Sequence, residues 1–134
     1  MFNFFKNESL GALGERVAKN HYKALGFKIV GENFFNRTGK QLGEIDFIAI
    51  TKQDLVFVEV KTRTAEISAF GSAVDAVTAS KQQKLVKIAK LFMQNHVQYS
   101  NLNPRIDVCS ILCDSLDKTV KNITIIPNAV EDMY

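Results

Sequence analysis

Two neighbouring segments, residues 43–50 and 55–61, are rich in Ile, Val and Phe and are separated by the four residues Thr51 to Asp54. Both segments have the composition of β-strands, and a short polar connection between two strands predicts a hairpin. Strands that are apolar on both faces are usually buried on both faces. Charged side chains in such strands are costly unless they are paired or bound to a metal. The charged side chains of the hairpin are therefore expected to be paired or to bind a metal.

Folding the hairpin symmetrically about its turn places Asp46 opposite Glu59 and Glu44 opposite Lys61. Like charges directly opposite each other across two strands are destabilising. A divalent cation held between the carboxylates of Asp46 and Glu59 is the simplest compensation. A register shift of two residues would keep both carboxylates on one face but make them diagonal neighbours.

The order Asp46, then Glu59-Val60-Lys61 on the next strand, is the sequence pattern of a metal-dependent nuclease centre. Two carboxylates suit Mg²⁺ or Mn²⁺, and such an ion lowers the pKa of a bound water and stabilises charge on phosphoryl oxygens. Lys61 shares a strand face with Glu59, so it can orient the attacking water or neutralise developing charge. The main-chain carbonyl of Val60 can supply a further metal ligand.

This pattern resembles the PD-(D/E)xK signature of the restriction-endonuclease-like superfamily, with Ile45 in place of the proline. Further short motifs occur in a fixed order along the chain: Gly14-Glu15, Gly43-Glu44-Ile45-Asp46, Val56 to Arg63, Phe70-Gly71, Ala76-Val77-Thr78, Lys81-Gln82 and Arg105-Ile106-Asp107-Val108. Together they resemble the YraN-type family of small predicted endonucleases, from about Leu10 to Asn128. The segment Asn36 to Leu42, beside the site, looks a few residues longer than is usual in that family.

The resemblance implies a Mg²⁺- or Mn²⁺-dependent nuclease that hydrolyses phosphodiesters of DNA. It implies branched or structured DNA as the substrate, as for Holliday junction resolvases, in repair or recombination. In that role Asp46 and Glu59 bind the metal, Lys61 positions the water and Glu15 completes the acidic cluster. Because a fold does not establish an activity, the alternative is a nucleic-acid-binding or interaction protein that retains a weak or inactive nuclease site.

Four further residues are candidates for supporting roles. Glu44 is expected to pair with Lys61. Gln82 begins the second long helix, where a glutamine approaches the site in related nucleases. Arg63 and Lys81 are expected to contact substrate phosphates. For Lys61 the alternative role is a salt bridge to Glu44. For Gln82 the alternative is an ordinary polar residue at the N-terminus of a helix.

The formal net charge of +3 and the isoelectric point near 8.9 are compatible with a nucleic-acid partner but do not predict one alone. Lys84, Lys87 and Lys90 follow Lys81 at intervals of three and wind around their helix. For Lys87 and Lys90 a solvated helix face is the favoured interpretation. One active site per chain makes a homodimer attractive for cutting two strands, although the sequence shows no interface.

Periodicity and turn residues predict the order α-β-β-β-α-β-β: an α/β fold with a mixed central sheet flanked by helices. The restriction-endonuclease-like core has the same α-β-β-β-α-β order. The first helix has Ser9 as N-cap and an apolar stripe that ends at Ala24 and Leu25, and the second begins at Ser80 with Gln83 as a capping box. The predicted elements are helices Ser9–Leu25 and Ser80–His96, strands Phe27–Phe35, Arg105–Cys113 and Asn122–Pro127, and the hairpin.

At 134 residues the chain is expected to form a single domain, 1–134, with a core of about residues 9–128 and loosely held ends. No segment has the character of a signal peptide or a transmembrane helix, so a cytoplasmic location without membrane attachment is expected. Cys109 and Cys113 are expected to be buried, reduced thiols.

Overall fold

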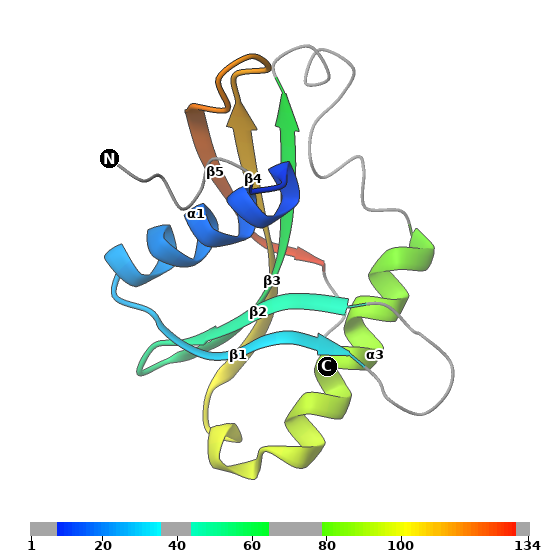
Figure 1. The fold of residues 1–134 in the computed structure, drawn as a ribbon. Coiled ribbons are helices and arrows are strands. Elements are labelled where there is room, and N and C mark those ends of the chain that lie inside the picture. The colour runs from blue at the N-terminus through cyan, green and yellow to red at the C-terminus, as the bar shows by residue number, and fades with distance from the viewer. Residues whose placement is uncertain (1–7, 36–43, 65–78, 131–134) are drawn as a thin grey trace.

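The computed structural model describes residues 8–35, 44–64 and 79–130. In these residues a twisted sheet of five strands has a long helix on each face (Figure 1). The segment Asn36 to Leu42 and the motifs Phe70-Gly71 and Ala76-Val77-Thr78 lie outside the described residues, as do both chain ends. The elements are α1 Leu10–Ala24, β1 Lys28–Phe35, β2 Glu44–Ile50, β3 Asp54–Thr64, α3 Ala79–Asn95, the short 3₁₀ helix η1 Val97–Tyr99, β4 Asn103–Cys113 and β5 Val120–Val130.

The strands lie in the order β1-β2-β3-β4-β5. All neighbours are antiparallel except β3 and β4, which are parallel. Parallel neighbours need a long crossover, and α3 lies in the connection between β3 and β4. The sheet is therefore mixed, as predicted, and β1 is an edge strand.

The β2–β3 hairpin has the symmetric register expected from the sequence. Ile50 pairs with Leu55 and Ile48 with Phe57, and the ladder ends one step after that. Residues 44–46 of β2 therefore lie beyond the last paired residues, and they pair only with β1 on their other side. The two strands separate at the point where the acidic residues begin.

Helix α1 begins as predicted, with the Ser9 hydroxyl accepting a hydrogen bond of 3.1 Å from the amide of Ala12. Its apolar stripe was predicted wrongly at the C-terminal end, because Leu25 is 56% exposed. The helix ends at Ala24 and the chain turns at Gly26, whose φ of 98° suits glycine. Tyr22 is the residue that closes the buried face instead.

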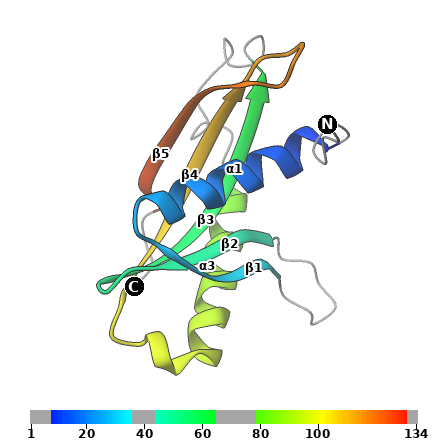
Figure 2. The same ribbon diagram turned by 60° about the vertical axis from the view of Figure 1, so that its left-hand side comes forward.

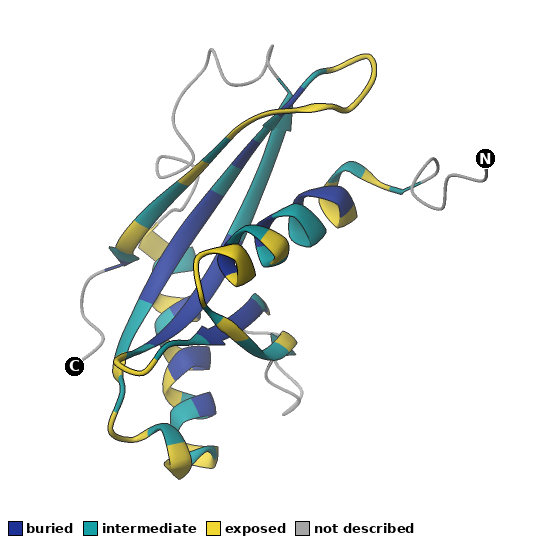
Figure 3. Cartoon of the chain, turned by 90° about the vertical axis from the view of Figure 1, so that its left-hand side faces the viewer, coloured by how far each residue is buried: buried dark blue, intermediate teal, exposed yellow. Residues whose placement is uncertain are grey.

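Helix α3 buries the predicted stripe of Leu85, Ile88, Ala89 and Phe92. It begins at Ala79, however, so Ser80 lies in the first turn and does not cap the helix. The two helices bury opposite faces of the sheet, as the views in Figures 2 and 3 show. The α3 core includes Ile48 and Phe57, whereas the α1 core includes Phe47 and Val58.

Strand β5 continues to Val130, past the predicted end at Pro127, and Val130 is 2% exposed. The pairing of Val130 with Ile106 explains the extension, because β4 supplies the partner that the sequence pattern could not show. A register irregularity between Ile106 and Val108 accommodates Pro127, which has no amide to donate. None of the helices in the described ranges is long and apolar enough to cross a membrane.

Candidate metal centre

Asp46 lies at the fork where β2 and β3 separate. The main-chain amide of Val60 donates a hydrogen bond of 2.7 Å to Oδ2 of Asp46. In a continuing antiparallel ladder this amide would donate to a main-chain carbonyl of β2. The carboxylate of Asp46 takes the place of that carbonyl, so the end of the ladder fixes the position of the side chain.

Glu59 brings the second carboxylate to the fork and is buried, with 7% of its surface exposed. Its Oε1 accepts two ion pairs, from Nζ of Lys61 at 3.3 Å and from Nζ of Lys81 at 2.9 Å. Its Oε2 is buried and has no hydrogen-bond partner in the described structure. A buried polar atom without a partner is destabilising, and native proteins rarely retain one without a reason.

A divalent cation fits the donor atoms at this fork. Glu59 Oε2 offers a free lone pair, and Asp46 uses only one oxygen for the amide of Val60. The N–H and C=O of one strand residue point to the same neighbour, so the carbonyl of Val60 also faces the fork. No group of three or more Asp, Glu, His or Cys side chains within the described residues is arranged to hold a metal ion. Mg²⁺ commonly binds through one or two carboxylates and keeps several waters.

The neighbouring carboxylates raise the pKa of Asp46. Burial, together with the negative charge of Glu59, raises the pKa of Asp46 to about 8, although the amide of Val60 lowers it. Glu15 raises it further through its charge and a side-chain hydrogen bond. Without a cation, Asp46 therefore retains a proton at neutral pH, as expected for clustered acids.

Glu15 reaches Asp46 because α1 packs unusually close to β3. A Cβ atom added to Gly14 would overlap the hydroxyl of Thr62 and would lie 2.9 Å from its Cβ. Only glycine permits this approach, and the residue after it is the acid that reaches the site. The Gly14-Glu15 motif noted in the sequence thus has a direct packing explanation.

The two lysines at Glu59 differ in origin and environment. Burial and the neighbouring ammonium group of Lys81 lower the pKa of Lys61, against the opposing attraction of Glu59. Lys81, from the first turn of α3, pairs directly with Glu59, and its contact with substrate phosphates stays a prediction. The sequence could not show this pair, since α3 approaches β3 only through tertiary packing.

The remaining predicted residues are more dispersed. Glu44 is exposed and pairs with Phe35 of β1. The β2–β3 ladder ends before Glu44 could face Lys61, and Lys61 forms an ion pair with Glu59. The expected Glu44 partnership is therefore not part of the hairpin. Arg63 is half-buried near the end of β3, and Gln82 lies in the first turns of α3.

Sequence reasoning missed a buried polar network on the α1 face. The hydroxyl of Tyr22 donates a hydrogen bond of 2.8 Å to Oδ2 of Asp107, which is fully buried. Arg105 donates to Asp107 at 3.0 Å and also pairs with Asp54 at 3.2 Å. The amide of Asn128 is the third partner of Asp107, at 3.0 Å. The alternating charges of Arg105 and Asp107 within an apolar strand were the available signal.

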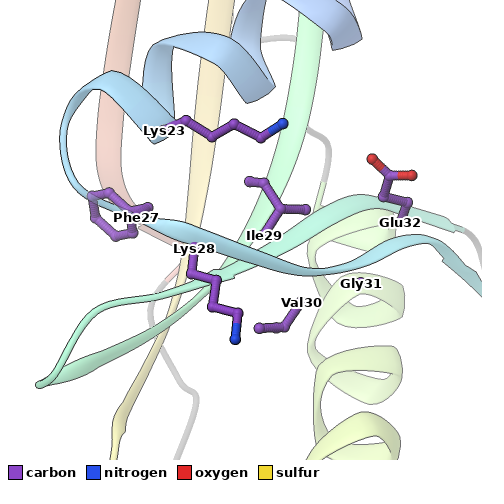
Figure 4. Close-up of a pocket in the computed structure, with 7 residues that line it drawn as sticks. All are labelled: Lys23, Phe27, Lys28, Ile29, Val30, Gly31 and Glu32. Carbon is purple, nitrogen blue, oxygen red and sulfur yellow. The ribbon is translucent and has the colours of Figure 1, made fainter.

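A shallow hollow of about 680 Å³ lies between the end of α1 and the edge strand β1, away from these carboxylates. Figure 4 shows Ile29 and Glu32 projecting from β1 toward the side of Lys23, and Val30 toward the other side. Its single carboxylate, Glu32, pairs with Lys19 at 3.0 Å. The acidic pair at the fork, not this hollow, is therefore the candidate site.

The mixed five-stranded sheet, the two flanking helices and the acidic fork define an α/β protein with a restriction-endonuclease-like core. Residues 14–111 match the model of "Uncharacterised protein family UPF0102". A UPF0102 protein of Caldanaerobacter subterraneus subsp. tengcongensis is 36% identical over 91% of this chain and 94% of its own length. A UPF0102 protein of Clostridium botulinum strain Loch Maree is 34% identical over 93% of this chain and 96% of its own length. The chain belongs to the UPF0102 family, which is the YraN family.

Proposed function

We propose that this protein is a Mg²⁺- or Mn²⁺-dependent nuclease that hydrolyses phosphodiesters of DNA in the cytoplasm. The observation that carries the proposal is the pair of carboxylates at the fork, with Glu59 Oε2 buried and unpartnered among the described residues. Two acids from adjacent strands beside a half-buried lysine are suited to phosphodiester chemistry. Structured or branched DNA, in repair or recombination, is the substrate class we favour, with a homodimer supplying two sites for two strands.

Asp46, Glu59 and the carbonyl of Val60 would hold the cation. Once bound, the cation would supply a water of lowered pKa and charge stabilisation at the phosphoryl oxygens. The amide of Val60 keeps the carboxylate of Asp46 directed at the fork. Glu15 would help to orient the carboxyl group of Asp46, since the two side chains share a hydrogen bond.

Lys61 has two properties that suit a role beside the scissile phosphate. Its pKa is lowered, so the side chain can exchange a proton more readily than an exposed lysine. Its amine also lies 3.3 Å from Glu59 Oε1, which keeps it at the fork. Lys81 shares the same oxygen and would keep Glu59 paired when Lys61 moves toward substrate.

The test is cleavage of labelled single-stranded, duplex, flap and four-way-junction DNA in Mg²⁺ and in Mn²⁺. Wild type is compared with Asp46→Asn, Glu59→Gln and Lys61→Met, and Glu32→Gln serves as a control carboxylate at the sheet edge. Metal-dependent cutting by wild type and by the control, reduced about 100-fold or more in the site variants, is the expected result. Equal cutting by all variants would show that another protein or another site is responsible.

A second candidate is a nucleic-acid-binding protein whose site turns over slowly or not at all. The observation in its favour is that no three acidic, His or Cys side chains within the described ranges are arranged to hold a metal. Calorimetric titration with Mn²⁺ separates the two candidates. Binding of Mn²⁺ by wild type that is lost in Asp46→Asn favours the nuclease, whereas DNA binding without metal binding favours the second candidate.

A further inference from the structure

Helix α3 carries four lysines and no acidic residue. The lysines are Lys81, Lys84, Lys87 and Lys90, each three residues after the last. Helix residues three apart are neighbours on the surface, and such rows form a ridge inclined to the helix axis. We call these four side chains the lysine ridge. The three-residue spacing winds the lysines around the helix, and it also makes each lysine a surface neighbour of the next.

One end of the lysine ridge lies in the candidate site, because Lys81 pairs with Glu59 at 2.9 Å. The other end lines a hollow of about 360 Å³ on α3, the α3 hollow. Its lining residues are Ala79, Gln82, Gln83, Val86, Lys87, Lys90 and Val130. The ridge therefore connects the buried carboxylates to an open, amide-lined and cationic surface.

The outer lysines of the ridge are not neutralised within the described structure. Lys84, Lys87 and Lys90 are exposed, and none of them has an ion pair with a described carboxylate. Helix α1 differs, since its Arg16 pairs with Glu8 and its Lys19 with Glu32. Uncompensated like charges on one helix are mildly destabilising, which favours an external anion as their partner.

The geometry points to the lysine ridge and the α3 hollow as a track for the phosphate backbone of one nucleic-acid strand. Lys81 and Lys90 are separated by about 13 Å along the helix axis, the axial length of roughly four phosphates of one strand. Gln82 and Gln83 can donate to and accept from sugar and phosphate oxygens. Contacts of this kind hold a strand without reading its sequence. The catalytic end of the track rests on the proposed function, whereas binding along it does not require cleavage.

The test is fluorescence anisotropy of labelled single-stranded DNA, the matching duplex and RNA of the same sequence, without divalent metal and over a range of salt. Lys84→Gln/Lys87→Gln/Lys90→Gln is compared with Lys23→Gln/Lys28→Gln/Lys52→Gln, which removes the same charge from exposed lysines elsewhere. The ridge variant is expected to bind at least about tenfold more weakly, with a salt slope lower by roughly 2 to 3. The control is expected to change by less than about threefold.

Equal weakening of the two triple variants would overturn the track, because net charge alone would then explain binding. Unchanged binding by the ridge variant would also overturn it while leaving the nuclease proposal intact. Wild type that binds through the ridge but never cuts would sustain the track and defeat the nuclease. If the lysine ridge bound anionic lipid vesicles more tightly than any of the nucleic acids, the track would be overturned and a membrane surface would be the partner. Circular dichroism melting checks that both variants fold, and Lys87→Glu alone provides a milder second variant.

Discussion

The amide of Val60 on β3 donates to the side chain of Asp46 on β2, immediately beyond the last main-chain pair between these strands. This bond joins the end of a ladder to a carboxylate, so the strands can separate without leaving the amide unpaired. In the proposed function, the cation would bind where the two strands separate. The proposed chemistry therefore depends on where the ladder ends as much as on which residues are acidic.

Asp46→Asn is expected to stabilise the metal-free protein, and more so as the pH rises. The pKa of Asp46 is about 8 in the folded chain, against an ordinary value of 3.8, so the folded state retains a proton that the unfolded state has lost. Stability contributed by this residue therefore falls as the pH rises from about 4 to about 8. Asparagine keeps an acceptor for Val60 without the charge.

Thermal unfolding in EDTA should show the smallest difference in melting temperature between wild type and Asp46→Asn at about pH 4, below which the side chain is protonated in both the folded and the unfolded state. At pH 8 the variant is expected to melt a few degrees higher. Asp114→Asn is the matched control, because hydrogen bonds from the amides of Leu116 and Asp117 lower the pKa of Asp114 and give no gain on neutralisation. A variant at Asp46 that is less stable than wild type at pH 8 would contradict the crowding of carboxylates at the fork.

Gly14→Ala is expected to destabilise the protein by about 2 kcal/mol, because the new methyl group would overlap the hydroxyl of Thr62. Gly11→Ala is the control: among the described residues, no atom outside its neighbouring residues and its own helix backbone lies within 4 Å of the added methyl group, so it should be neutral or stabilising by up to about 1 kcal/mol. Urea unfolding measures both. Combining Gly14→Ala with Thr62→Gly should recover part of the lost stability. If no stability is recovered, the strain lies somewhere other than the contact between Gly14 and Thr62.

Removal of the hydroxyl in Tyr22→Phe should cost about 1–2 kcal/mol, because Asp107 loses one of its buried hydrogen bonds. Asp107→Ala should cost about 3–5 kcal/mol, since Arg105 loses its buried partner as well. Tyr99→Phe is the control, because the Tyr99 ring stacks on Phe92 and His96 and the change keeps this ring, with an expected change below about 0.5 kcal/mol. Chemical denaturation of the three variants checks this order. Equal losses of stability in Tyr22→Phe and Tyr99→Phe would show that the Tyr22–Asp107 hydrogen bond does not stabilise the fold.

Cys109 and Cys113 are expected to be unreactive toward a thiol reagent at pH 8 in the folded protein. Burial, with a contribution from Asp107, raises the pKa of Cys109 to about 12, and burial also raises the pKa of Cys113. Both thiols should become reactive in denaturant, where the thiolate is exposed. Val97→Cys provides a control thiol at a position that is 73% exposed. Rapid labelling of either native cysteine would contradict their burial.

Much of this protein was decided by its sequence. The two apolar segments and the short connection between them predicted β2 and β3, and the symmetric register assumed for them is the observed one. The helical spacing of Leu85, Ile88, Ala89 and Phe92 predicted the buried face of α3. The hairpin pairing also predicted that Asp46 and Glu59 are neighbours, and their charges do interact in the folded chain.

Tertiary structure alone decided how distant residues meet at the fork. No local pattern shows that α3 directs Lys81 at Glu59, that α1 carries Glu15 to Asp46, or that the ladder ends before Glu44 can face Lys61. It likewise decided that Tyr22, not Leu25, closes the buried face of α1, through its bond to Asp107 on β4. Local sequence specifies strands, helices and the faces they bury. Contacts between elements far apart in the chain depend on how those faces pack together, and packing is a property of the whole fold.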